Sequence, residues 1–245
     1  MDYMTDKKPY NSVDDVIALL DENKNQRGID NWEKLSNKHE LTSYGIGLTQ
    51  LRKLAKKIGR SCSLSALLWQ SDVYDAKVIA LLIDDPKAIT EAQAEQQVDE
   101  LAAGMLVHVY SSCDATLAKS PLAFDLANRW LETNDEYRRK SAYGLLYELS
   151  KNKRNTKLTD EFFFNCLDHL EERLKADNES KSMRLAMGGS LMGIGKRNKA
   201  LNLRSAQIAK DIGPIDFNED GGKCDPFDVH KHLVSPSLLE KLNKS

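Results

Sequence analysis

The chain has 245 residues, of which 41% are hydrophobic and 29% charged, and its formal net charge at pH 7 is −2. This length allows a substantial core, and the composition is ordinary for a soluble globular protein. No segment approaches the roughly 18 apolar residues of a membrane-spanning helix. The N-terminal residues also lack the apolar core of a signal peptide. These features exclude an integral membrane protein, and we expect a cytoplasmic one.

Helix start and stop signals recur at short intervals in the first half of the chain. Ser12 is a candidate N-cap for a helix that runs through Leu20. Residues 49–58 carry an apolar stripe at helical spacing, and Gly59 is the expected stop. Further helices are expected over 72–85, capped by Ser71 and ended by Pro86, over 91–103, capped by Thr90, and over 105–110.

The second half continues the same pattern. Helices are expected over 121–132, beginning at Pro121, over 135–150, capped by Asn134, and over 160–176, capped by Thr159. Two more follow over 180–195 and 200–213. The last residues, 214–245, form an irregular polar segment and a closing helix that begins at Ser235 and Pro236.

This pattern predicts an all-α fold. It gives roughly twelve helices joined by short connectors, and helix pairs recur at about 35 to 45 residues, the period of HEAT or armadillo hairpins. No alternating strand pattern or low-complexity linker interrupts the chain. We therefore predict an α-solenoid of HEAT- or armadillo-like helical hairpins that forms a single domain over residues 1–245.

The four cysteines are scattered and form no CxxC pair, which predicts reduced thiols rather than a disulfide framework. Cys113 is interpreted as a buried small residue rather than a reactive thiol. The cysteines are Cys62, Cys113, Cys166 and Cys224.

The charges are unevenly distributed, although the acidic net charge by itself argues against a nucleic-acid binder. Acidic residues concentrate in 84–100 and 216–228, whereas basic residues concentrate in 52–60, 138–140, 151–157 and 196–204. One basic face would be compatible with phosphate binding. The alternative, which charge runs more often indicate, is a set of solvated helix faces.

Five segments carry a resemblance to a known family, and they occur in the same order as in that family. They are residues 43–59, 68–85, 109–122, 136–149 and the stretch from 182 to 233. No single segment is specific, but the ordered set resembles the DNA alkylation repair proteins of the AlkD type. The resemblance implies HEAT-like repeats whose concave basic surface holds duplex DNA. It also implies excision of positively charged N-alkylated purines by an aspartate and two tryptophans.

The resemblance assigns roles to individual positions. Asp114 falls on the catalytic aspartate, and Tyr110, four residues earlier, falls on the first tryptophan. Arg139 or Lys140 falls on an arginine that contacts the DNA backbone. The second tryptophan is expected in the 186–195 helix, where this sequence has Gly188 and Gly189 and no aromatic residue.

The chemistry of Asp114 and Tyr110 fits these roles. A carboxylate stabilises the positive charge that develops on the sugar, and an aromatic face can assist it. At a spacing of four residues on a helix, the two side chains share one face. The alternatives are a capping or surface carboxylate for Asp114 and a core or rim aromatic for Tyr110. No cofactor is expected.

Other basic residues are candidate DNA contacts, because phosphate contacts supply affinity without reading sequence. For each of them a solubilising surface position is the alternative. They are Arg52, Lys53, Lys56, Lys57, Arg184, Lys196 and Arg197, in addition to Arg139, Lys140 and Tyr110.

Two further patterns indicate no ligand. The glycines of 188–195 precede Lys196 and Arg197, but they lack GxxxxGK[ST] and a preceding strand, so close helix packing is the favoured interpretation. The spacing of four potential metal ligands does not match a structural zinc pattern, and no metal is predicted. Those four residues are Cys224, Asp225, His230 and His232.

Three functional interpretations remain open. The first is an alkylpurine DNA glycosylase that acts on duplex DNA through a basic concave face. The second is a non-catalytic relative that recognises distorted or branched DNA, and the third is a protein-interaction scaffold. We expect a monomer without a membrane partner, associated with the nucleoid if the protein is prokaryotic.

Overall fold

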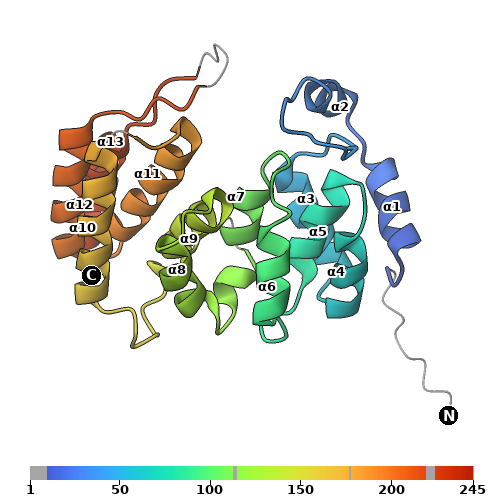
Figure 1. Cartoon of the computed structure of the whole chain (residues 1–245), viewed down its shortest axis with the longest axis horizontal. Coiled ribbons are helices and arrows are strands. Elements are labelled where there is room, and N and C mark those ends of the chain that lie inside the picture. Colours follow the sequence, from blue (N-terminus) through green and yellow to red (C-terminus); the bar gives the residue numbers. More distant parts are fainter. Residues whose placement is uncertain (1–9, 113–114, 177, 219–223, 245) are drawn as a thin grey trace. The chain divides into compact units, whose positions relative to one another are not determined.

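The structure is a computed structural model that describes residues 10–112, 115–176, 178–218 and 224–244. These residues form helices joined by short connectors (Figure 1), and none of them lies in a β-sheet. Two isolated bridges are formed, between Thr42 and Val73 and between Ile215 and Phe227. The predicted all-α fold is confirmed. In the described part of the chain, no helix has both the length and the apolar character needed to cross a membrane.

The helices pack into two compact units, Met1–Leu122 (unit 1) and Ala123–Ser245 (unit 2). The assignment of residues 1–245 to a single domain stays a prediction. Unit 1 contains α1 (Val13–Glu22), α2 (Gln26–Trp32), α3 (Leu48–Ile58), α4 (Cys62–Trp69), α5 (Tyr74–Ile83), α6 (Glu91–Val98), α7 (Leu106–Ser111) and the 3-10 helix η1 (Leu117–Lys119). Unit 2 contains α8 (Ala123–Leu131), α9 (Glu136–Leu149), α10 (Asp160–Ala176), α11 (Lys181–Gly195), α12 (Lys199–Ile212), α13 (Val229–Leu233) and α14 (Pro236–Asn243).

Helix α5 is the centre of unit 1. It packs against α1, α3, α4 and α7. Most of its residues are therefore buried, from Asp75 through Leu81 together with Ile83. A helix that is apolar on nearly all sides is stable only in such a central position.

Helices α9 and α11 occupy the corresponding position in unit 2. Helix α9 packs against α8 and α11, and α11 packs against α10, α12 and α13. The largest buried side chains of this unit are Trp130, Tyr143 and Phe163. Both units are thus built from helical hairpins around one or two central helices.

Several predicted helix starts are confirmed. The Ser12 hydroxyl accepts a hydrogen bond from the Asp15 amide at 3.1 Å, and the Asp15 carboxylate in turn accepts one from the Ser12 amide. Thr90, Thr159 and Ser235 precede α6, α10 and α14 as predicted. These starts were predictable because capping is a local interaction within four residues.

Other boundaries differ from the prediction. Helix α5 begins after Val73, because the Ser71 hydroxyl accepts from the Val73 amide and so caps a turn before the helix. Asp135, not Asn134, caps α9. Helix α6 ends at Val98, five residues earlier than expected. The short helices α2, α4 and α13 were not predicted, although Asn25, Ser61 and Asp228 cap them.

Candidate functional site

Helix α3 presents the basic side chains of unit 1. Its apolar stripe is buried, whereas Lys53, Lys56 and Lys57 are exposed on the other side. Among the residues that the structure describes, no carboxylate pairs with Lys53 or Lys56. A hydrogen bond with Tyr10 raises the pKa of Lys57, whose ammonium lies 5.2 Å from the centre of that ring. Arg52 is half-buried and already interacts with other residues.

A buried carboxylate holds the turn that leads into α3. Asp75 of α5 has no exposed surface, and its two oxygens accept hydrogen bonds from the Ser43 hydroxyl at 2.7 Å and from the amides of Tyr44 and Ile46 at 2.8 and 3.1 Å. The three donors satisfy a charge that would otherwise be very costly to bury. The position of α3 therefore depends on the central helix of the unit.

Glycine is required where this turn meets α2. Gly45 has a φ of 68°, and a Cβ on it would lie 2.3 Å from the Ile29 nitrogen. A Cβ on Gly28 would lie 2.0 Å from the Gly45 oxygen. The two backbones therefore touch directly, and neither position has room for a side chain.

Asp114 and Cys113 lie outside the described residues, whereas Tyr110 lies in α7. The tyrosine is 2% exposed, and its hydroxyl donates a hydrogen bond to the Ala94 carbonyl oxygen at 2.8 Å. Burial of both ring and hydroxyl favours the core-aromatic alternative for Tyr110. Its role as a DNA contact stays a prediction.

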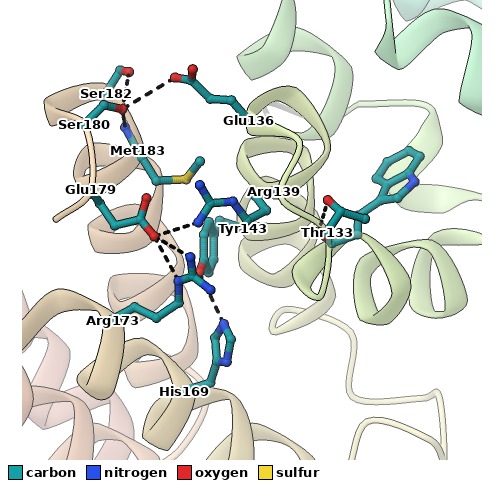
Figure 2. A network of polar contacts seen from close by, with 11 residues as sticks. Thr133, Glu136, Arg139, Tyr143, His169, Arg173, Glu179, Ser180, Ser182 and Met183 are labelled. Atoms are coloured by element: carbon teal, nitrogen blue, oxygen red, sulfur yellow. Dashed lines mark hydrogen bonds and ion pairs between the residues drawn. The ribbon is translucent and has the colours of Figure 1, made fainter. Parts of the chain in front are cut away.

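In unit 2, the candidate Arg139 belongs to a half-buried ionic cluster, the arginine–glutamate cluster of Arg139, Arg173 and Glu179. Figure 2 shows the Glu179 carboxylate beside both guanidinium groups. Its Oε1 accepts from Arg139 Nη1 at 2.6 Å, and from Arg173 Nε and Nη2 at 2.9 and 2.6 Å. The cluster joins α9, the C-terminal end of α10 and the residue before the N-cap of α11.

The electrostatics of this cluster keep Glu179 ionised. Burial raises the pKa of its carboxyl group, but the hydrogen bonds from Arg139 and Arg173 outweigh burial, so the pKa lies below its usual value. Burial and the charge of Arg173 lower the pKa of the neighbouring His169. Burial also raises the pKa of Tyr143 to about 12. In this cluster two cationic arginines thus contact one ionised glutamate, Glu179.

Lys140 is also paired. Its ammonium lies 2.5 Å from Glu136 Oε1, one turn earlier on α9, and its side chain is 15% exposed. The Ser180 hydroxyl donates a hydrogen bond to the same oxygen at 3.4 Å. The hydrogen bond from Lys140 is the main reason why the pKa of Glu136 lies below its usual value.

Arg197 is held almost entirely by backbone. Its Nη1 donates to the carbonyls of Ser150 and Asn152, and its Nη2 to that of Leu158, all at 2.8 Å. Its guanidinium also lies over the Phe163 ring, 4.8 Å from the centroid. These contacts fix the connector between α9 and α10, so a structural role is favoured over a phosphate contact.

The two remaining basic candidates of unit 2 differ from each other. Arg184 is half-buried, and its Nη1 donates to the Leu174 carbonyl oxygen at 3.0 Å. Lys196 is exposed, and partial burial of its side chain together with the charge of Lys151 lowers its pKa. Lys196 therefore remains available to solvent, and its role in DNA binding stays a prediction.

The glycines of α11 allow close packing, as the favoured interpretation proposed. A Cβ on Gly188 would lie 2.6 Å from Ile215 Cδ1 and 3.3 Å from the Phe227 ring. A Cβ on Gly193 would lie 2.5 Å from the Tyr147 ring. Nothing lies within 4 Å of such an atom on Gly189. The C-terminal segment thus covers α11 at Gly188 and leaves Gly189 open.

The C-terminal segment is held by local hydrogen bonds. The Asn218 side chain bonds both the amide and the carbonyl of Cys224, at 3.1 and 2.7 Å, and Asp228 caps α13. Within the described ranges, no group of three His, Cys, Asp or Glu residues is arranged to hold a metal ion. The segment also lines an open groove of about 800 Å³ with Leu185, Phe217, Phe227 and Val234 on its walls.

Sequence reasoning did not find Asp75, Arg173 or Glu179. The hydrogen-bond partners of each of these residues lie at least six positions away in the chain. An isolated carboxylate on an otherwise apolar helix, as at Asp75, was the one signal that pointed to a buried polar contact.

Comparison with known proteins identifies the family. The model of a family described as DNA alkylation repair enzyme matches residues 16–205. No curated protein sequence matches the chain. One solved structure, of a new family of proteins related to the HEAT-like repeat DNA glycosylases with affinity for branched DNA structures, is similar with a TM-score of 0.77. It shares 20% identity, and the match covers 96% of this chain and 95% of that one.

This structural likeness concerns the fold alone, and it confirms the predicted HEAT-like arrangement of helical hairpins. The family model shows the family, since it spans most of the 245 residues and includes α3, α5, α7, α9 and the first half of α12. The chain therefore belongs to the DNA alkylation repair enzyme family.

Proposed function

We propose that this protein binds DNA through phosphate contacts and recognises branched or distorted DNA without excising bases. The observation that carries the proposal is the exposed basic side of α3, where Lys53 and Lys56 have no carboxylate partner among the described residues. Unpaired surface lysines on a rigid helix supply affinity for phosphates without reading base sequence.

Two further observations support recognition without excision. Tyr110 is buried, with its hydroxyl bonded to the Ala94 carbonyl oxygen, so its ring is enclosed by the protein. Helix α11, where the resemblance expects the second tryptophan, has Gly188 and Gly189 and no aromatic residue over 186–195, and Gly188 is covered by Ile215 and Phe227. The similar solved structure belongs to proteins with affinity for branched DNA structures.

Excision of N-alkylated purines is the second candidate function. The family's description as a repair enzyme favours it, as does Asp114, which occupies the position of the catalytic aspartate in the resemblance. A carboxylate there would stabilise the cationic sugar during cleavage of the glycosidic bond.

One experiment separates the two candidates. We would titrate a four-way junction, a mismatched duplex and a plain duplex of equal length over about 50 to 200 mM salt. We expect tighter binding to the junction and a linear fall of log K with log salt. Absence of binding at low salt would refute the proposal, and equal affinity for all three DNAs would refute the preference for branched DNA.

Base release is measured on the same preparations. Methylated duplex is incubated with the protein, and free 3-methyladenine and 7-methylguanine are quantified. We expect no release above the protein-free control. Release that is abolished by Asp114→Asn would establish the glycosylase instead.

A further inference from the structure

The arginine–glutamate cluster has more donors than its single carboxylate satisfies well. Three N–H groups from two arginines converge on one oxygen, Glu179 Oε1. The Nε of Arg139 is buried and has no hydrogen-bond partner. Two cations face one anion within the cluster, and Glu132 and Glu136 add weaker electrostatic interactions with Arg173 and Arg139.

A DNA phosphate could take the place of this carboxylate. A phosphodiester, like a carboxylate, shares one negative charge between two oxygens, and a guanidinium can engage both of them through two parallel hydrogen bonds. In the present arrangement Arg139 uses only Nη1 on Glu179. The Arg173 side chain is 34% exposed, so the cluster is reached from solvent on that side.

Glu179 is also positioned so that it could leave the pair. It lies in the connector between α10 and α11, directly before Ser180, the N-cap of α11. Because Glu179 lies outside both helices, its side chain could turn away from the arginines without unwinding either helix. Arg139 and Arg173, by contrast, both lie within regular helices.

We propose that Glu179 is an internal competitor for Arg139 and Arg173, and that a DNA phosphate displaces it when DNA binds. The proposal rests on the proposed DNA binding and adds two features to it. Arg173 becomes a DNA contact, and Glu179 becomes a positioning residue that holds both guanidinium groups in place and competes with any DNA phosphate that reaches them.

The test replaces Glu179 by glutamine, which keeps the shape and removes the competing charge. We expect Glu179→Gln to bind the four-way junction several-fold more tightly at 100 mM salt. The slope of log K against log salt should stay close to that of the wild type, because the same phosphate contacts form in both complexes once Glu179 has been displaced. The matched control is Glu148→Gln, which also removes one acid with a mostly buried side chain and releases one cation, the exposed Lys151 just after α9. It should change affinity less than Glu179→Gln and leave the slope nearly unchanged.

A double-mutant cycle shows where the gain arises. In the background of Arg139→Gln, the gain from Glu179→Gln should shrink, because one of the two released cations is absent. If Arg139→Gln leaves the gain in affinity unchanged, the gain arises from net charge alone and the proposal is overturned.

Folding is verified by circular dichroism and thermal unfolding of each variant. If Glu179→Gln does not fold, Glu179→Asp, which keeps the charge but retracts it by one methylene, should still show part of the gain. Failure of both to fold would mean that Glu179 cannot leave the pair, and the proposal would be wrong.

The outcome also separates this inference from the proposed function. Wild-type binding without a larger gain in Glu179→Gln than in Glu148→Gln overturns the inference alone. Absence of binding in both wild type and Glu179→Gln overturns both. Binding by Glu179→Gln where wild type shows none supports the competition in its strongest form.

Discussion

The two units present their basic residues in opposite ways. On α3 of unit 1, Lys53 and Lys56 are exposed and have no carboxylate partner among the described residues. In unit 2, Arg139 and Lys140 are paired with glutamates, and Arg197 is enclosed by three backbone carbonyls. Apart from Lys196, which is exposed, the basic candidates of unit 2 are thus less available to a ligand than Lys53 and Lys56, and their side-chain and backbone partners account for the difference.

This contrast has consequences for binding. Exposed lysines interact with any nearby phosphate, and salt screens that interaction strongly. A paired arginine contributes only after its partner has been displaced, so it responds to DNA of the right geometry. We therefore expect α3 to supply general affinity and the arginine–glutamate cluster to supply selectivity. Three predictions test this comparison.

The largest expected effect comes from Asp75→Ala, which removes the support of α3. The Ser43 hydroxyl and the amides of Tyr44 and Ile46 would lose their acceptor. Leaving such buried donors unsatisfied should lower the free energy of unfolding by about 3 to 5 kcal/mol. Urea denaturation measures the change.

The control for this variant is Asp72→Ala, three residues earlier and exposed, which should change stability by no more than about 0.5 kcal/mol. A similar, small change in both variants would show that the buried carboxylate does not hold the 43–46 turn.

The second prediction concerns the affinity for DNA. Replacing Lys53, Lys56 and Lys57 together by glutamine should weaken binding to plain duplex and junction DNA alike, by roughly 30- to 100-fold at low salt. The slope of log K against log salt should become shallower by about two to three. Fluorescence anisotropy over a salt series measures both quantities.

The matched control changes three lysines that already pair with carboxylates, Lys24, Lys175 and Lys244. This control alters the net charge equally and should lower DNA affinity much less. If both triple variants lose the same affinity, net charge and not the α3 surface would determine binding.

The smallest expected effect concerns Tyr110. Tyr110→Phe removes the hydrogen bond to the Ala94 carbonyl and should cost about 1 kcal/mol of stability. Because the ring is buried, DNA affinity should not change. A loss of DNA binding or of base release with unchanged stability would show that Tyr110 contributes directly to function.

Local interactions were predictable from the sequence. Helix caps such as Ser12 and Thr90, the apolar stripe of α3 and its stop at Gly59 all involve neighbours within one or two turns. Their outcome depends little on the rest of the chain, which is why the all-α fold and most helix positions were predicted correctly. Where the start of a helix was misplaced, as at Ser71, a nearby turn competed for the same capping side chain.

By itself, then, the sequence determined the helical class, the order of the hairpins and the family resemblance, because periodicity, capping and ordered motifs are properties of the linear chain. Only the tertiary structure decided which polar groups are available. Asp75 meets its donors 29 to 32 residues away, and Glu179 meets Arg139 40 residues away. Such pairings arise when helices pack together, and burial then decides whether a charge is held within the protein or is open to a ligand.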